Sequence, residues 1–166
     1  SDPTVVRATV RSYLAGHPPF HILVNNTGGP PSGQVLDATD EAFRAAFGMH
    51  LLANHALVQL LVPGMRAEKY GRIVNIISTS VKAPIPGLGV SNTIRGAMAS
   101  WAKTLAGELG PFGITVNNVL PGFTATERLA ALIKGRAAKS NAPEDTVSRE
   151  MRGTIPLGRF AQPEEV

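Results

Sequence analysis

Cysteine is absent from this chain of 166 residues. Its absence excludes disulfide bonds and thiolate metal ligands. The histidines follow no spacing typical of a metal site; they are His17, His21, His50 and His55. We therefore expect no structural metal.

Aromatic residues are scarce, at 5% of the sequence, and the basic residues are spread along the chain although the formal net charge is +4. A nucleic-acid-binding protein typically gathers basic side chains on one surface. The composition therefore favours solvated basic residues over a nucleic-acid interface. The densest basic stretch, residues 128–139, could instead meet an acidic substrate group or a cofactor phosphate.

Long apolar runs are missing as well. The stretch "ALVQLLV" falls well short of the roughly 20 residues that span a bilayer. The sequence also does not open with a charged segment followed by an apolar one, as a secretory leader does. We predict a soluble, cytoplasmic protein without a membrane segment.

What is present is an alternation of helices and buried strands. Apolar residues at helical spacing predict helices in "SDPTVVRATVRSYLAG", from "DATDEAF" to "VPGM", and in "VSNTIRGAMASWAKTLAGELG". An oxygen-bearing residue is expected to cap the first helix, and Thr39 or a nearby aspartate the second. The apolar runs "HILVNN", "GRIVNIIS" and "ITVNNVLPG" predict strands. Such strands indicate an α/β fold with a parallel sheet covered on both sides.

The carboxyl ends of these strands carry the polar motifs. Right-handed crossovers place "NNTGG", "STS" and "PGFTAT" along one edge of the sheet, where open α/β sheets bind ligands. Beyond Thr126 the sequence is only weakly patterned. We expect residues 127–155 to form a substrate lid, within a single domain that covers residues 1–166.

Four segments resemble the short-chain dehydrogenase/reductases, in particular their 3-oxoacyl-carrier-protein-reductase-like branch. "LVNNTGG" is similar to the NNAG turn of that family, and "GRIVNIIS" to its serine strand. "WAKTLAGELGPFGITVNNVLPGFTAT" resembles its late helix, strand and PG turn, and "IPLGRFAQPEEV" its exit segment. The resemblance implies strands four to six of a Rossmann-like, doubly wound parallel sheet.

The resemblance also implies a function. The family interconverts secondary alcohols and ketones, and NAD or NADP carries the hydride. Its two long helices pack against a second subunit, so a homo-oligomer is expected. The implied cofactor-binding residues are Asn25, Asn26, Gly28, Gly29, Arg95, Pro121, Gly122 and Thr126. For Gly28 and Gly29 the alternative is ordinary turn geometry, and for Gly122 and Thr126 a tight turn with a helix cap.

The family's TGxxxGxG phosphate loop has no counterpart in this sequence. Its first three strands and its last helix and strand also have none. The strand "HILVNN" would then be an exposed apolar edge. We therefore expect the sequence to be a piece of a larger domain, with a natural three-strand protein as the alternative.

The active site of the family is only partly matched. Alignment of "WAKTLAGEL" places the family's tyrosine at Ser91, its lysine at Arg95, its serine at Ser78 and its asparagine at His50. A serine hydroxyl is a far weaker acid than a phenol, so Ser91 does not replace the tyrosine. Histidine has the side chain whose unperturbed pKa lies closest to neutrality.

We hypothesise a rewired site in which Ser78, His50 and Arg95 act together. The alternatives are a helix histidine satisfied by a neighbour, a solvated or interface arginine, a capping serine at position 91, and a Ser78 hydroxyl bonded to nearby backbone. Beside the enzyme hypothesis stands that of a catalytically silent relative that serves as an interaction module. A nucleic-acid-binding fragment is the weakest alternative.

Overall fold

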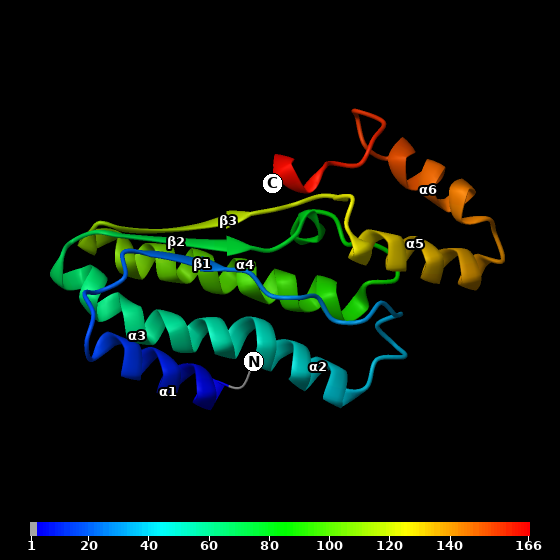
Figure 1. Cartoon of the computed structure of the whole chain (residues 1–166). Helices are drawn as coiled ribbons and strands as arrows, with labels where there is room; N and C mark the ends of the chain where they lie inside the picture. The colour runs from blue at the N-terminus through cyan, green and yellow to red at the C-terminus, as the bar shows by residue number, and fades with distance from the viewer. Residues whose placement is uncertain (1–2) are drawn as a thin grey trace. The chain divides into compact units, whose positions relative to one another are not determined.

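Three parallel strands form the sheet of this protein, for which a computed structural model describes residues 3–166 (Figure 1). The strands are β1 (Ile22–Asn25), β2 (Gly71–Ile76) and β3 (Ile114–Val119), in the spatial order β1-β2-β3. The predicted α/β class and all three predicted strands are confirmed. Because β1 pairs only with β2 in this sheet, it is an edge strand, as expected.

The chain divides into two compact units, Ser1–Leu120 and Pro121–Val166. The first unit contains the sheet, the helices α1 (Pro3–Leu14), α2 (Asp40–Phe47), α3 (Ala53–Ala67) and α4 (Gly89–Leu109), and the short turns η1 (Gly48–Leu52), η2 (Thr79–Val81) and η3 (Gly110–Phe112). The predicted cap of the first helix lies outside the described residues. All three helices predicted for this part of the chain are confirmed, the second of them as α2, η1 and α3 together.

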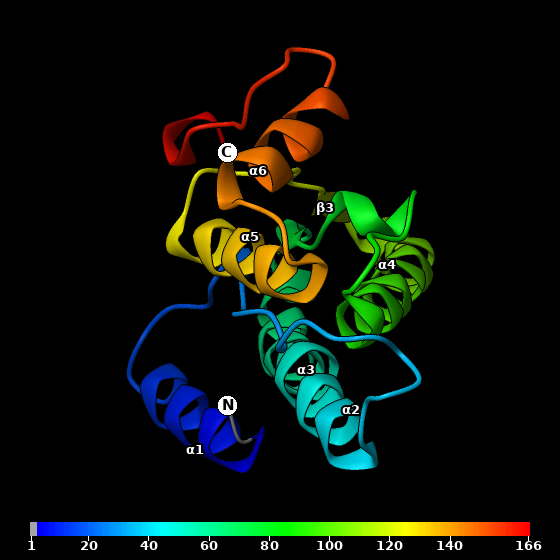
Figure 2. The ribbon, with the colours of Figure 1, turned by 90° about the vertical axis from the view of Figure 1, so that its right-hand side faces the viewer.

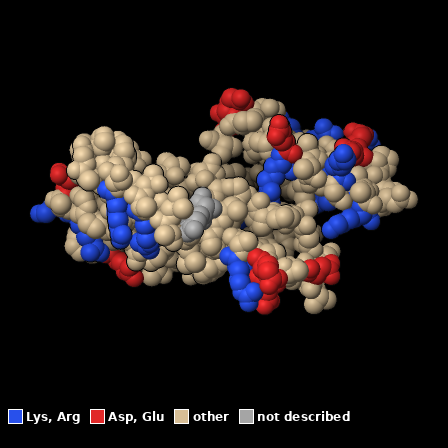
Figure 3. Space-filling model, turned by 60° about the horizontal axis from the view of Figure 1, so that its bottom comes forward, with Lys and Arg blue, Asp and Glu red and all other residues tan. Residues whose placement is uncertain are grey.

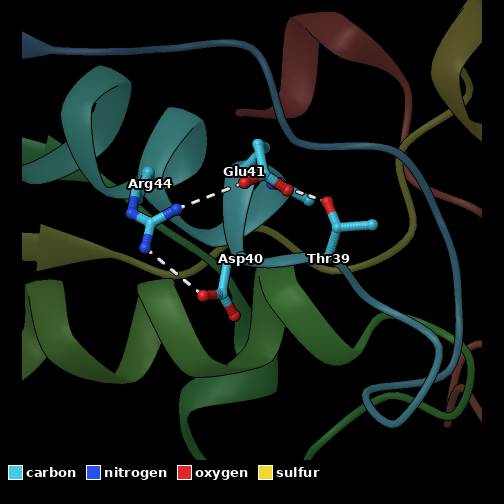
Figure 4. Close-up of polar contacts among 5 residues, drawn as sticks. Thr39, Asp40, Glu41 and Arg44 are labelled. Carbon is cyan, nitrogen blue, oxygen red and sulfur yellow. Dashed lines mark hydrogen bonds and ion pairs between the residues drawn. The ribbon is translucent and has the colours of Figure 1, made fainter.

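A long helical rod is formed by α2, the π turn η1 and α3 together (Figures 1 and 2). It begins where predicted, because the Thr39 hydroxyl accepts a hydrogen bond from the amide of Ala42 at 3.2 Å. Figure 4 shows this first turn, where Arg44 also pairs with Asp40 and Glu41. The rod continues past Pro63 to Ala67, two residues beyond the end of "VPGM".

By length and composition alone, this rod could cross a membrane: its mean hydropathy reaches 1.4 over an 18-residue window. The core helix of a soluble protein meets the same criteria, and 44% of the window is buried inside the protein. Its apolar side chains belong to the main core, which joins them to α4 and the sheet. That core consists of Leu23, Val58, Leu61, Val62, Met65, Ile73, Ala102, Leu109, Ile114 and Val116.

Only one face of the sheet is covered within the first unit. Helices α3 and α4 lie against the face that carries Leu23, Ile73 and Val116, and α1 packs on the outer side of α3 (Figure 2). On the opposite face, Ile22 is 60% exposed and Val24 57% exposed. The described helices of the first unit therefore cover the face that carries Leu23, and alternate positions of β1 on the other face are exposed.

The second unit has a small core of its own. The helices of this unit are α5 (Glu127–Ser140), α6 (Glu144–Gly153) and the turn η4 (Pro163–Glu165). Leu129, Ala137, Val147 and Met151 form its buried core. A backbone bridge between Thr124 and Ala161 joins its two ends. The weakly patterned region is thus largely helical, and its role as a lid stays a prediction.

Candidate active site at the carboxyl edge of the sheet

A row of asparagines crosses the three strands at their carboxyl ends. Asn25, Asn75 and Asn118 are neighbours in the register of the parallel sheet. The Asn25 amide donates to Asn75 Oδ1 at 2.8 Å, and the Asn75 amide donates to Asn118 Oδ1 at 3.0 Å. Asn25 and Asn75 are buried, so water cannot replace these bonds. This asparagine ladder fixes the positions of the strand ends that lead into the candidate site.

His50 lies in the π turn η1 and is 1% exposed. A π turn inserts a residue into an α-helix and is frequent at functional sites. The ring Nδ1 lies within hydrogen-bonding distance of the Thr27 hydroxyl, in the loop that follows β1. This contact fulfils the alternative of a histidine satisfied by a neighbour. It also places the imidazole beside the NNTGG loop.

Arg95 reaches the same loop from α4. Its Nη1 donates to the carbonyl oxygen of Ile76 at 2.9 Å, and its Nη2 to that of Thr27 at 3.4 Å. The side chain is 9% exposed, so the solvated charge offered as an alternative is not what the structure has. The guanidinium ties the end of β2 to the loop after β1. Thr27 thereby contacts both His50 and Arg95.

The two serines occupy different positions. Ser91 is buried, four residues before Arg95 in α4, and it is not the helix cap, because the cap position is Leu88. Ser78 follows β2, and its hydroxyl accepts a hydrogen bond from the amide of Ser80 at 3.1 Å. Ser78 thus makes the backbone contact that was its alternative role. It lies two residues beyond Ile76, the residue held by Arg95.

The entrance to α4 is held by a residue that the sequence patterns did not single out. The Asn92 side chain donates to the carbonyl of Ile85 at 2.9 Å and accepts from its amide at 3.3 Å. A backbone bridge also joins Gly33 to Leu88. Asparagine can form such a two-bond clamp because its amide carries both a donor and an acceptor. The loop between β2 and α4 is therefore fixed beside the candidate site.

The predicted cofactor-binding residues lie in both units. In the first, Asn26 and Gly28 are exposed, and a Cβ atom on Gly28 would meet nothing within 4 Å. In the second, Pro121 and Gly122 precede α5, and Thr126 stands at its N-cap position, with its hydroxyl bonded to the Thr124 carbonyl at 3.3 Å. The protein's own packing therefore does not require glycine at position 28.

The whole sequence, residues 1–166, matches the profile of the family described as enoyl-(acyl carrier protein) reductase. The chain belongs to the short-chain dehydrogenase/reductase family. It is therefore a member of a family of oxidoreductases, as its resemblance predicted.

Known relatives agree with this family. A Streptomyces virginiae protein named as a ketoacyl reductase of the monensin polyketide synthase is 32% identical over 167 residues, which cover 99% of this chain and 64% of the relative. L-sorbose reductase from Gluconobacter frateurii, solved with NADPH and L-sorbose, is 30% identical, with a TM-score of 0.85 over 98% of this chain and 62% of that one.

A third relative is actinorhodin polyketide ketoreductase, solved as a variant with NADPH. It is 26% identical, with a TM-score of 0.89 over 99% of this chain and 64% of the ketoreductase. The chain thus spans less than two thirds of the length of each of these three relatives.

The active-site assignment made from the family motifs stays a prediction. It puts Ser91, Arg95 and His50 where the family has tyrosine, lysine and asparagine, and Ser78 where the family has serine. Thr27 stands where the NNAG turn has alanine. The sequence patterns missed Thr27 as a site residue, although its departure from that turn was a visible signal.

Proposed function

We propose that this protein is, or is part of, an NAD(P)-dependent oxidoreductase that interconverts a secondary alcohol and a ketone, with a 3-oxoacyl or similar carbonyl substrate. The observation that carries this proposal is the convergence of His50 and Arg95 on Thr27 at the carboxyl edge of the sheet. Ketoacyl reductases among the relatives support the substrate class.

The residues of the first unit fit one part of a dinucleotide. The open space at Gly28 and the exposed side chain of Asn26 leave room for the adenosine half beside the NNTGG loop. Pro121, Gly122 and Thr126 are proposed to contact the nicotinamide end. Arg95 is proposed to act near the ribose, since its guanidinium is bonded to Thr27 of the NNTGG loop. When bound, the cofactor supplies the hydride.

The protein's own residues would handle the oxygen and the proton. Ser78 is proposed to bind the carbonyl oxygen, since it ends the strand beside the crevice where ligands bind in such sheets. His50 is proposed to donate the proton to that oxygen, because an imidazole nitrogen can carry a proton and give it up. Arg95 would stabilise negative charge on the oxygen through its permanent positive charge. Ser91 lines the site without serving as the acid.

Association through the long helices is the second part of the proposal. Helix α3 and its preceding turn carry Leu52, which is 43% exposed, and α4 carries the half-buried Trp101. Charges of both signs are interspersed on the face shown in Figure 3, with broad uncharged surface between them. Apolar side chains with exposed area on two neighbouring helices suit contact between two identical subunits. As a separate part of the proposed function, residues 127–155 act as a lid over the substrate.

A fluorescence titration of the purified chain with NADPH and with NADH tests the function. Saturable binding, followed by turnover with a panel of ketones, supports an oxidoreductase, and Ser78→Ala should then lower turnover without abolishing cofactor binding. The absence of binding up to millimolar cofactor would favour the silent interaction module instead. The mass of the particle in solution, measured by light scattering, tests the association.

A further inference from the structure

We infer that Thr27 is a positioning residue that holds the imidazole of His50 in the orientation from which it exchanges protons. This inference rests on the proposed function of the same site. It assigns a task to Thr27, which contacts both of these side chains, His50 through its hydroxyl and Arg95 through its carbonyl.

The geometry gives the hydroxyl control over the ring. The His50 ring is buried, and it is carried by a π turn rather than by a regular α-helix. Thr27 lies 23 residues earlier in the sequence, in a different element, so the contact fixes the ring against the loop and not merely within its own helix. Since Nδ1 faces Thr27, the proposed proton exchange would use the other ring nitrogen, Nε2, which is buried in this structure.

The Thr27 hydroxyl can hold the ring throughout such an exchange. When Nε2 gives up a proton and regains one, Nδ1 keeps its own proton, so the hydroxyl oxygen of Thr27 can accept a hydrogen bond from Nδ1 in both states. The same contact therefore persists before and after the exchange at Nε2.

The loop itself is held still by Arg95. Its guanidinium donates to the Thr27 carbonyl, and it also donates to the Ile76 carbonyl at the end of β2. The hydroxyl of Thr27 is thus anchored to the sheet before it meets the imidazole. An anchored partner orients a catalytic group more narrowly than a mobile loop does.

Nuclear magnetic resonance of protein labelled with ¹⁵N-histidine tests the contact without any need for turnover. His50→Gln identifies the His50 signals among those of the four histidines. We expect Thr27→Val, which keeps the shape and removes the hydroxyl, to shift the Nδ1 resonance of His50, and Thr27→Ser to restore it. Thr93→Val is the matched control, because it removes an exposed hydroxyl that bonds within α4.

An unchanged Nδ1 resonance in a folded Thr27→Val protein would overturn the inference, as would a failure of Thr27→Ser to restore it. If Thr27→Val does not fold, hydrogen exchange measured on the wild-type protein tests the contact instead. A slowly exchanging hydrogen on the Thr27 hydroxyl or on His50 Nδ1 supports the contact, and exchange at the solvent rate contradicts it.

Kinetics then separate positioning from a purely structural contact. General acids contribute on the order of 10²–10⁴ in rate, so we expect Thr27→Val to lower kcat at least tenfold, with KM within about twofold, and Thr27→Ser to recover most of the loss. A shifted resonance with unchanged kcat would overturn the positioning role. Failure of the proposed function would be seen in a different experiment, because the wild-type protein would then bind neither NADPH nor NADH.

Discussion

Replacement of Arg95 by methionine should destabilise the first unit through two backbone carbonyls. Methionine keeps much of the length and apolar volume of the arginine stem but cannot donate to Ile76 or Thr27. A hydrogen bond from a charged donor contributes about 1.5–3 kcal/mol, and both of these bonds are partly buried, so water replaces them only in part. We therefore expect the free energy of unfolding to fall by about 3 kcal/mol in Arg95→Met.

Urea unfolding followed by circular dichroism measures this change, provided that the dependence on urea keeps its slope. Arg72→Met is the matched control. Arg72 also donates to two carbonyls, those of Gly71 at 2.8 Å and Gly113 at 3.1 Å, but its side chain is only partly buried. Water can replace its bonds, so the control should lose less than about 1 kcal/mol. Equal losses in the two variants would refute the reasoning.

Three further predictions follow from the structure, one on the asparagine ladder, one on two glycines and one on pH. Asn75→Leu removes both bonds of the asparagine ladder and should cost about 2–4 kcal/mol in urea unfolding; a loss below 1 kcal/mol would contradict the ladder. Gly89→Ala should destabilise, because its Cβ would lie 2.5 Å from loop backbone, whereas Gly107→Ala, with open space, should raise the melting temperature. Hydrogen bonds from Arg159 and the Gln162 amide lower the pKa of Glu165 from 4.5 to about 2. Since the folded pKa is the lower one, the stabilisation is complete above pH 4.5 and is lost as the pH falls towards 2, which carboxyl titration by nuclear magnetic resonance would show; a midpoint near 4.5 would contradict it.

The regular elements of the first unit could be predicted from local pattern. The Thr39 cap, the apolar periodicity of α4 and the β-branched runs of the strands depend on neighbours in sequence, and the structure has each of them. The π turn at His50 was not predicted, because the apolar spacing runs through it without interruption. The rod passes Pro63 for a similar reason: residues on both sides of it pack into the core and keep the helix.

The sequence named candidate residues for the site, but it did not predict which residues their side chains contact. Alignment with family motifs named Ser78, His50, Ser91 and Arg95, and the parallel strands bring their ends to one edge. The partner of each side chain depended on register and on the path of the loops, which no local pattern encodes. Thr27, for example, was part of a motif and became a site residue only through its contacts.

The sequence by itself determined the family and the α/β class, because these follow from motif order and apolar periodicity. Only the tertiary structure decided that Arg95 donates to backbone carbonyls, that His50 meets Thr27, and that one sheet face lacks helices in the first unit. The physical reason is the distance along the sequence over which each interaction acts. Periodicity and caps act over a few residues, whereas the buried polar contacts of this site join residues as far as 68 positions apart.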